Sequence, residues 1–391
     1  MSAPLKGYRI LDLTNVLAGP FCCHQLAHLG AEVIKVERPG GGDLARQLGA
    51  DADLNREHMG VSFLAQNAGK GSVTLDLKSA EDQDKFIALV KEADVLVENF
   101  RPGVMARLGL DFDSLKQVNK QLIYCAISGF GQDGPLSTFP AYDQIIQGMS
   151  GVMSITGDAE HSPYRVGYPL ADTIGGLTAA MAINAALAEP ERRAHFIDVS
   201  MLDSVLATMG WAVSNLLVAG HAPTPLGNDN VTASPSGTFR TGDGLLNIAA
   251  NKQEQFEALS HLLKHSEWIT DTRFANRQAR LEHRKELKSL IETALSENTT
   301  EHWWHAMVGV GVPAGPVYSV EEALNHPQVR ERGLIERFDD AGIGRPLKVV
   351  SGGYRIDGQA PRVTTPPPLL GADNARWFGT QPTKPRQESG A

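Results

Sequence analysis

The sequence predicts an α/β protein with a larger domain built on a parallel, helix-covered sheet and a smaller α+β domain. Short continuous apolar runs alternate with helical segments through the first half of the chain, which is the pattern of strands buried on both faces. The length of 391 residues exceeds what one ordinary core supports, so a second domain is expected. A shift toward Pro, Gly, Asn, Ser and Thr at 220–237 marks the crossing between the two domains.

The strands of the predicted sheet can be placed in chain order. The apolar runs lie at 9–13, 31–36, 72–77, 94–97, 122–127 and 196–199. Helical segments at 21–29 and 79–93 separate neighbouring runs, as a parallel sheet requires. Because such a sheet binds ligands at the carboxyl ends of its strands, the residues that follow these runs are candidate ligand contacts.

One stretch, from Gly167 to Gly176, brings a single carboxylate to the start of an apolar helix. The residues at 177–187 are apolar on every side, so this helix is expected to run through the core. A helix N-terminus favours an ionised Asp172, and Gly175 with Gly176 allows other groups to approach closely. Taken alone, the stretch is explained more simply by Asp172 as a helix N-cap.

The smaller domain is predicted to begin with a hairpin-like pair of strands at 237–240 and 245–249, which turns at Gly242-Asp243-Gly244. Helical segments follow the hairpin. We expect the large domain to comprise residues 1–220 and 335–391, and the small domain to comprise 225–330.

Composition excludes several classes of protein. The net charge of −9 argues against a general nucleic-acid binder. No run approaches the roughly 20 apolar residues of a membrane span, and the first residues lack the apolar core of a signal peptide. The three cysteines, Cys22, Cys23 and Cys125, offer no disulfide framework. We therefore expect a cytoplasmic protein with no membrane partner.

Nucleotide and metal signatures are weak. The turn at 15–20 has no G-x-G-x-x-G, and no G-x-x-x-x-G-K-[ST] occurs. His24 and His28 lie four apart on a predicted helix, but no third ligand is evident, so ordinary helix positions are favoured and no metal is expected. Basic residues near the predicted strand ends would suit phosphates, although each alone is more simply a solvated surface charge. They are Arg38, Lys78, Arg101 and Arg107.

Segments distributed over nearly the whole chain share one resemblance. They are 9–20, 30–39, 67–78, 97–100, 128–131 with Gly134-Pro135, 141–143, 271–274 and 311–313. In these segments the chain resembles the class III coenzyme A transferases, the CaiB/BaiF family of formyl-CoA transferase, carnitine-type CoA transferases and α-methylacyl-CoA racemases. The resemblance implies a large domain, which is built on a Rossmann-like parallel sheet and completed by the C-terminal segment, a small domain between, and an interlocked homodimer.

The resemblance also implies roles for individual residues. Asp172 is the expected nucleophile, which forms an acyl anhydride and then an aspartyl-CoA thioester. CoA is a substrate rather than a tightly bound cofactor, and its implied contacts are Val16, Leu17, Arg38, Leu75, Asp76, Lys78, Asn99, Phe100, Arg107, Ala141, Tyr142 and Asp143. Leu17 stands where the formyl-CoA branch has a glutamine, and 249–253 replaces that branch's glycine run. Neither that glutamine's donor role nor a mobile lid is carried over.

The expected reaction is transfer of CoA from an acyl-CoA, with succinyl-CoA as the leading donor, to a small carboxylic or dicarboxylic acid such as itaconate, citramalate or glutarate. Three alternatives stay open: 2-methylacyl-CoA racemisation, a formyl-CoA/oxalate-type transfer, and CoA binding without turnover. Bile acids and carnitine also stay open as acceptors. Racemases of the family carry a His-Asp pair where this chain has Tyr142-Asp143. A phenol, whose ordinary pKa is about 10, is a poor substitute for an imidazole, so a transferase is favoured.

Overall fold

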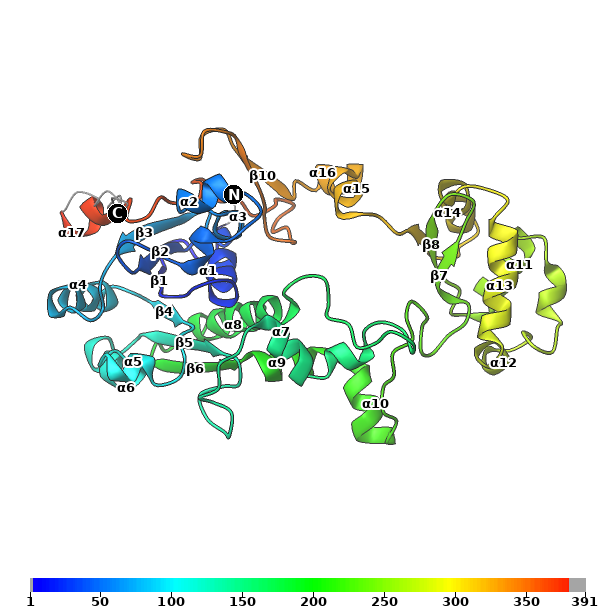
Figure 1. Cartoon of the computed structure of the whole chain (residues 1–391), viewed down its shortest axis with the longest axis horizontal. Coiled ribbons are helices and arrows are strands. Elements are labelled where there is room, and N and C mark those ends of the chain that lie inside the picture. Colours follow the sequence, from blue (N-terminus) through cyan, green and yellow to red (C-terminus); the bar gives the residue numbers. More distant parts are fainter. Residues whose placement is uncertain (1–2, 380–391) are drawn as a thin grey trace, which may run out of the picture. The chain divides into compact units, whose positions relative to one another are not determined.

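The structure is a computed structural model that describes residues 3–379 (Figure 1). Contacts between Cα atoms divide the chain into two compact units. The first unit comprises the residues up to Val152, the segment Arg165–His221 and the residues from Arg330 on. The second comprises Met153–Tyr164 and Ala222–Val329. The chain therefore leaves the first unit twice and returns to it twice.

A six-stranded sheet forms the centre of the first unit, and every neighbouring pair of its strands is parallel. The strands are β1 (Arg9–Asp12), β2 (Glu32–Glu37), β3 (Lys70–Thr74), β4 (Val95–Glu98), β5 (Ile123–Ser128) and β6 (His195–Ser200), in the order β3-β2-β1-β4-β5-β6. This is the order of a doubly wound sheet whose direction of winding reverses between β1 and β4. The predicted α/β class with a parallel sheet is confirmed.

Helices cover both faces of this sheet (Figure 1). Alternate residues of one strand enter different cores, because successive side chains of a strand point to opposite faces. Ile10 packs with α1 (Ala18–His28), α8 (Leu170–Leu187) and α9 (Met201–Thr208), whereas Leu11 packs with α4 (Ala80–Lys91) and α6 (Phe112–Val118). The other helices of this unit are α2 (Ala52–Arg56), α3 (Val61–Leu64), α5 (Val104–Arg107), α7 (Asp143–Met149), α10 (Trp211–Ala219) and α17 (Asn374–Phe378).

The apolar helix α8 is only partly buried in a single chain. Ala179 and Ile183 are fully buried against the core, but 49% of Leu177 and 68% of Met181 are exposed. The expectation that this helix is buried on every side is therefore wrong for one chain. With a mean hydropathy of 1.3 over 18 residues, α8 also has the length and composition of a membrane span, as does the bent pair α9 and α10. The sequence expectation that no run approaches a span is thus too strict, although α8 packs on α1 and on the sheet.

The C-terminal segment covers the edge of β3. Asp373 accepts a hydrogen bond from the backbone N–H of Ser72 (2.8 Å) and donates its own N–H to the carbonyl of Ser72 (2.9 Å). Asn374 accepts from the N–H of Thr74 (2.8 Å). Within the described residues this segment adds no strand to the six-stranded sheet. It forms instead a separate antiparallel pair, β10 (Ile335–Phe338) and β11 (Leu347–Val350).

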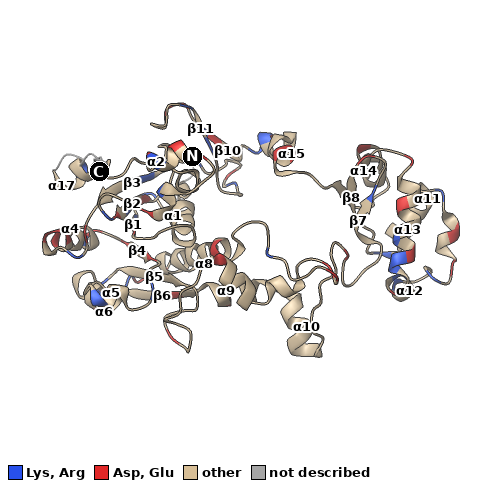
Figure 2. Cartoon of the chain, viewed as in Figure 1, with Lys and Arg blue, Asp and Glu red and all other residues tan. Residues whose placement is uncertain are grey.

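The second unit is built on an antiparallel sheet of three strands, β7 (Ser236–Arg240), β8 (Leu245–Ala249) and β9 (Ala314–Pro316). Its core includes Phe239, Ile248, Phe256 and Trp303. The helices are α11 (Gln253–Leu262), α12 (Arg277–Glu282), α13 (Arg284–Leu295), α14 (Thr300–Gly309) and α15 (Val320–Asn325), with α16 (Pro327–Glu331) at the boundary. Figure 2 shows acidic and basic residues interspersed along its helices, as on α13.

Candidate active site

The turn between β1 and α1 has an unusual backbone. Val16 has φ +67°, a left-handed conformation that a β-branched residue adopts at a cost of about 1–3 kcal/mol. Its N–H donates to Oδ1 of Asp43 (2.9 Å). The preceding residue, Asn15, exchanges two hydrogen bonds of 2.8 Å with the side chain of Asn99. The turn that begins α1 is therefore held from two sides.

The first turn of α8 carries Asp172. This helix begins at Leu170 after Pro169, so Asp172 is its third residue and not its N-cap. The interpretation of Asp172 as the N-cap of this helix is thus wrong. The backbone N–H of Ala171 donates to Oδ1 of Asp143 (2.8 Å), which supplies the acceptor that Pro169 cannot.

Close packing of two helices places Asp172 beside the start of α1. Gly176 follows Asp172 by four residues and so lies on the same face of α8. A Cβ atom added at Gly176 would lie 2.5 Å from the carbonyl oxygen of Ala18. The glycine thus allows the backbones of α1 and α8 to approach at this point, one turn beyond Asp172.

A cavity of about 220 Å³ lies at the carboxyl ends of β1, β4 and β5. It is lined by residues 15–18, 99–102, 127–129, Ser137, 139–142, Asp172 and Met201. Among these lining residues, Asp172 and Arg101 are the charged ones. Arg101 is exposed, and within the described part of the chain its side chain has no ion pair. The sequence placed Arg101 at a strand end but gave no signal that it belongs with Asp172.

The structure brings together seven of the thirteen residues predicted for the site. Val16, Leu17, Asn99, Phe100, Ala141, Tyr142 and Asp172 line the cavity. The other six do not line it. Arg38, Asp76, Lys78 and Arg107 are exposed, Leu75 is buried in the core beside α4, and Asp143 is buried beneath the start of α8.

The electrostatics of Asp172 follow from its position. Burial and, to a lesser extent, the negative charge of Asp143 together raise the pKa of its carboxyl group to about 7. The carboxylate therefore becomes predominantly ionised only above about pH 7. An ionised carboxylate that is poorly solvated is a stronger nucleophile than one in water.

Neutralising Asp143 should lower the pKa of Asp172, because the like charge that disfavours its ionised form disappears. In Asp143→Asn the amide oxygen can still accept from Ala171, so the helix start is kept. The acid limb of the pH profile of kcat/KM should then move to lower pH, measured between about pH 5 and 9. Asp113→Asn, which changes an exposed carboxylate on α6, should leave the limb in place. An unchanged limb in Asp143→Asn would refute this coupling.

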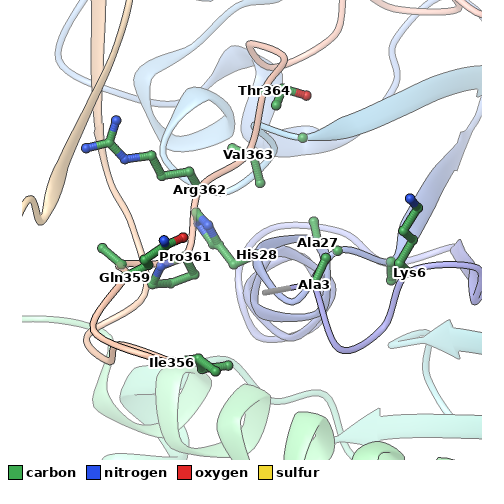
Figure 3. Close-up of a pocket in the computed structure, with 14 residues that line it drawn as sticks. Ala3, Lys6, Ala27, His28, Ile356, Gln359, Pro361, Arg362, Val363 and Thr364 are labelled. Carbon is green, nitrogen blue, oxygen red and sulfur yellow. The ribbon is translucent and has the colours of Figure 1, made fainter. Parts of the chain in front are cut away.

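A second cavity, of about 310 Å³, lies at the other end of α1 between His28 and the segment 359–364 (Figure 3). It contains none of the thirteen predicted residues. The ring of His28 lies against that of His24, with 4.4 Å between their centroids and an angle of 51° between their planes, and burial lowers the pKa of His28 to about 4. No group of three or more His, Cys, Asp or Glu residues suited to a metal ion occurs in the described residues. No carboxylate lines this cavity. The first cavity, which contains Asp172 and six other predicted residues, is therefore the candidate active site.

Comparison with known proteins identifies the family. The chain matches CoA-transferase family III over residues 5–374. It is 38% identical over 385 residues to the succinate–glutarate CoA-transferase of Agrobacterium fabrum, which is 95% of this chain and 94% of that protein. It is 39% identical over 350 residues to the acetyl-CoA:oxalate CoA-transferase of Acetobacter aceti, with coverages of 88% and 89%.

The fold agrees with this assignment. The crystal structure of a CAIB/BAIF family protein from Brucella suis is similar to this chain, with a TM-score of 0.84 and 34% sequence identity. The similarity covers 96% of this chain and 98% of that one. The chain belongs to CoA-transferase family III and is a class III CoA transferase.

Proposed function

We propose that this enzyme transfers CoA from succinyl-CoA to a small dicarboxylic acid, with Asp172 as the nucleophile. The observation that carries the proposal is the half-buried Asp172 carboxylate at the start of α8, in a cavity whose other charged lining residue is Arg101. The names of two relatives support the class of acceptor, because glutarate and oxalate are both dicarboxylates. Itaconate and citramalate belong to the same chemical class.

The proposed reaction proceeds by four displacements. An oxygen of Asp172 attacks the thioester carbonyl of succinyl-CoA, which breaks the C–S bond and gives a mixed anhydride and CoA thiolate. The thiolate attacks the Asp172 acyl carbon and expels succinate, leaving an aspartyl-CoA thioester. A carboxylate of the acceptor attacks this thioester and releases the thiolate again. The thiolate then attacks the acceptor carbonyl of the second anhydride and frees the carboxylate of Asp172.

The backbone at the start of α1 supports these steps. The N–H groups of the first helical residues have no partner within the helix, and Leu17 and Ala18 line the cavity with Asp172. We assign them to the oxyanion that forms at each tetrahedral step, where loss of one such donor typically costs about 2.7–4 kcal/mol of barrier.

The predicted cations are assigned to the anionic parts of the substrates. Arg101 meets a negative group inside the cavity, and the exposed Arg38, Lys78 and Arg107 meet the phosphates of CoA. Arg38 follows β2 directly and Lys78 lies in the loop between β3 and α4, whereas Arg107 ends α5, which follows β4. CoA binding is thereby assigned to the large domain expected from the sequence, 1–220 with 335–391.

The buried thiols of Cys22, Cys23 and Cys125 agree with a cytoplasmic location.

Intact-protein mass spectrometry with succinyl-CoA and hydroxylamine tests the proposal. Hydroxylamine attacks the activated acyl carbon of Asp172 and leaves a stable hydroxamate, so the wild-type mass should rise and Asp172→Ala should not change. An adduct would establish covalent transfer, and a screen of glutarate, oxalate, itaconate and citramalate would then identify the acceptor. If several acyl-CoA donors leave no adduct, the transferase mechanism fails for Asp172. Deuterium exchange at the α-carbon of a 2-methylacyl-CoA would then test racemisation, and its absence would leave CoA binding without turnover.

The exposed apolar residues of α8 and α10 support the proposal that two chains form an interlocked homodimer. Besides Leu177 and Met181, Leu217 and Val218 are 78% and 87% exposed. Val218→Asp would bury an unpaired carboxylate in such an interface. Light scattering after refolding should therefore give the mass of one chain for this variant and of two chains for the wild type. Val320→Asp changes an equally apolar residue on α15, 77% exposed, and should remain dimeric. A dimeric Val218→Asp variant would remove α10 from the interface.

A further inference from the structure

Beneath the turn that begins α1 lies a set of buried charged residues whose members come from distant parts of the chain. Nζ of Lys35 on β2 lies 3.0 Å from Oδ2 of Asp43, and both side chains are fully buried. The same Nζ donates to the carbonyl oxygen of Thr14 (2.7 Å). Oδ1 of Asp43 accepts from the backbone N–H groups of Val16 and Ala45, each at 2.9 Å. Lys35 and Asp43 thus bind the turn at residues 14 and 16.

A second buried pair binds the two ends of the same turn. Nζ of Lys70 on β3 donates to Oδ2 of Asp12 (2.8 Å) and to the carbonyl oxygen of Pro20 in the first turn of α1 (2.9 Å). Oδ1 of Asp12 accepts from the N–H of Thr14 (2.9 Å). The negative charges hold the pKa of Lys35 above its usual range, and the lysines hold the pKa of Asp12 below its usual range. Lys35 and Asp12 therefore stay charged at neutral pH.

The left-handed backbone of Val16 has to be imposed by its surroundings. A glycine would adopt φ +67° without steric cost, but a β-branched residue does so only where its neighbours over-determine it. The one hydrogen bond that Val16 donates goes to Asp43. The residues that follow directly, Leu17 and Ala18, line the cavity that contains Asp172. Any change in the backbone of Val16 therefore moves the cavity wall.

We propose that Asp43 is a positioning residue of the CoA-transfer reaction: paired with Lys35, it holds Val16 in the left-handed conformation and thereby places the N–H groups of Leu17 and Ala18 beside Asp172. This inference rests on the proposed function, because it assigns those N–H groups to the reaction. Asp43 itself does not line the cavity and acts through the backbone. Lys35, whose Nζ lies 3.0 Å from Oδ2 of Asp43, orients this carboxylate.

Single and double variants separate positioning from stability. Asp43→Ala should lower kcat by about 10²-fold, the typical effect of a misplacement of about 1 Å in a reacting site. Its Kd for CoA, measured calorimetrically, should stay near the wild-type value. Asp43→Ala also leaves Lys35 buried without its nearest carboxylate, so its melting temperature should fall. In the double variant Lys35→Met/Asp43→Ala the melting temperature should recover, whereas kcat should stay low, because Val16 still lacks its acceptor.

Asp94→Ala is the matched control. Asp94 also accepts a backbone hydrogen bond, from Arg9 (2.8 Å), and pairs with a cation, Arg192 (3.1 Å), but it directly precedes β4 and so lies at the amino ends of the strands, away from the cavity. The Asp94→Ala variant should be less stable than the wild type and should keep the wild-type kcat. A wild-type kcat in the double variant, or an equal loss of kcat in Asp94→Ala, would show that the Lys35–Asp43 pair is only structural.

The conformation of Val16 gives a readout that needs no turnover. A crystal structure of the double variant should show Val16 outside the left-handed region, and a φ still near +67° would overturn the proposal. If the wild-type enzyme fails to form the Asp172 hydroxamate with succinyl-CoA and hydroxylamine, the proposed function fails. The structure of the double variant then still decides whether Asp43 holds the turn.

Discussion

Asp172→Asn should lower kcat for CoA transfer by at least about 10⁴-fold, the range found when an enzyme loses its nucleophile. An amide neither attacks a thioester at a useful rate nor forms the anhydride that returns CoA. The side chain keeps nearly the same volume, so the cavity beside Leu17 and Ala18 should be preserved. The expected result is a large fall in kcat with an unchanged Kd for CoA, measured by steady-state kinetics and calorimetry.

Two controls sharpen this measurement. Asn at position 172 can deamidate to the wild-type Asp, so Asp172→Ala should be measured beside it and should show no slow recovery of activity. Asp143→Asn also neutralises a buried carboxylate in contact with α8, and it should retain most of the wild-type kcat at high pH, where Asp172 is ionised in both proteins. Transfer by Asp172→Ala within tenfold of wild type would rule out a covalent role for this residue.

Gly176→Ala should lower both stability and activity, because its Cβ would lie 2.5 Å from the carbonyl oxygen of Ala18 and 3.1 Å from Cδ1 of Phe21. The backbone carbonyl cannot move without shifting α1 or α8. Overpacking of this kind typically costs about 1–3 kcal/mol of the free energy of unfolding. Since Asp172 lies one turn away on the same helix face, we also expect kcat to fall by about 10²-fold.

Gly309→Ala provides the comparison for this variant. Gly309 is the last residue of α14, and a Cβ atom added there would have no heavy atom within 4 Å. The Gly309→Ala variant should keep the wild-type kcat and gain up to about 1 kcal/mol in the free energy of unfolding, because glycine is unfavourable in a helix. Denaturant unfolding and steady-state kinetics on both variants measure the contrast. A fully active Gly176→Ala would mean that the separation of α1 and α8 does not position Asp172.

Most of the sheet could be predicted from the sequence, because a strand buried on both faces shows itself as a continuous apolar run. The run at 9–13 contains β1, and the run at 122–127 overlaps β5. The run at 72–77 was placed too late, since β3 is Lys70–Thr74 and the chain turns where the N–H of Asp76 donates to Asp82. β3 begins with Lys70 and Gly71, which do not continue the apolar run, so its start could not be recognised from the sequence pattern.

The start of α8 could not be predicted from its own residues. Asp172 has the side chain of an N-cap, yet the helix begins two residues earlier because Asp143, 28 positions before Ala171, accepts the N–H of that residue. The burial of α8 was overestimated for a related reason. Apolar residues such as Leu177 and Met181 indicate that this side of the helix is to be buried. They do not indicate whether the residues that bury it come from the same chain or from a second one.

The sequence by itself determined the fold class, the strands and, through resemblance, the carboxylate at position 172, because apolar periodicity and short motifs are written in neighbouring residues. Only the tertiary structure decided that Arg101 shares a cavity with Asp172, that Asp143 raises the pKa of that carboxyl group, and that Asp43 holds the strained backbone of Val16. Val16 and Asp43 are 27 residues apart. Such hydrogen bonds and charge interactions depend on distances in space and on burial from water, and neither is expressed in the local pattern of the chain.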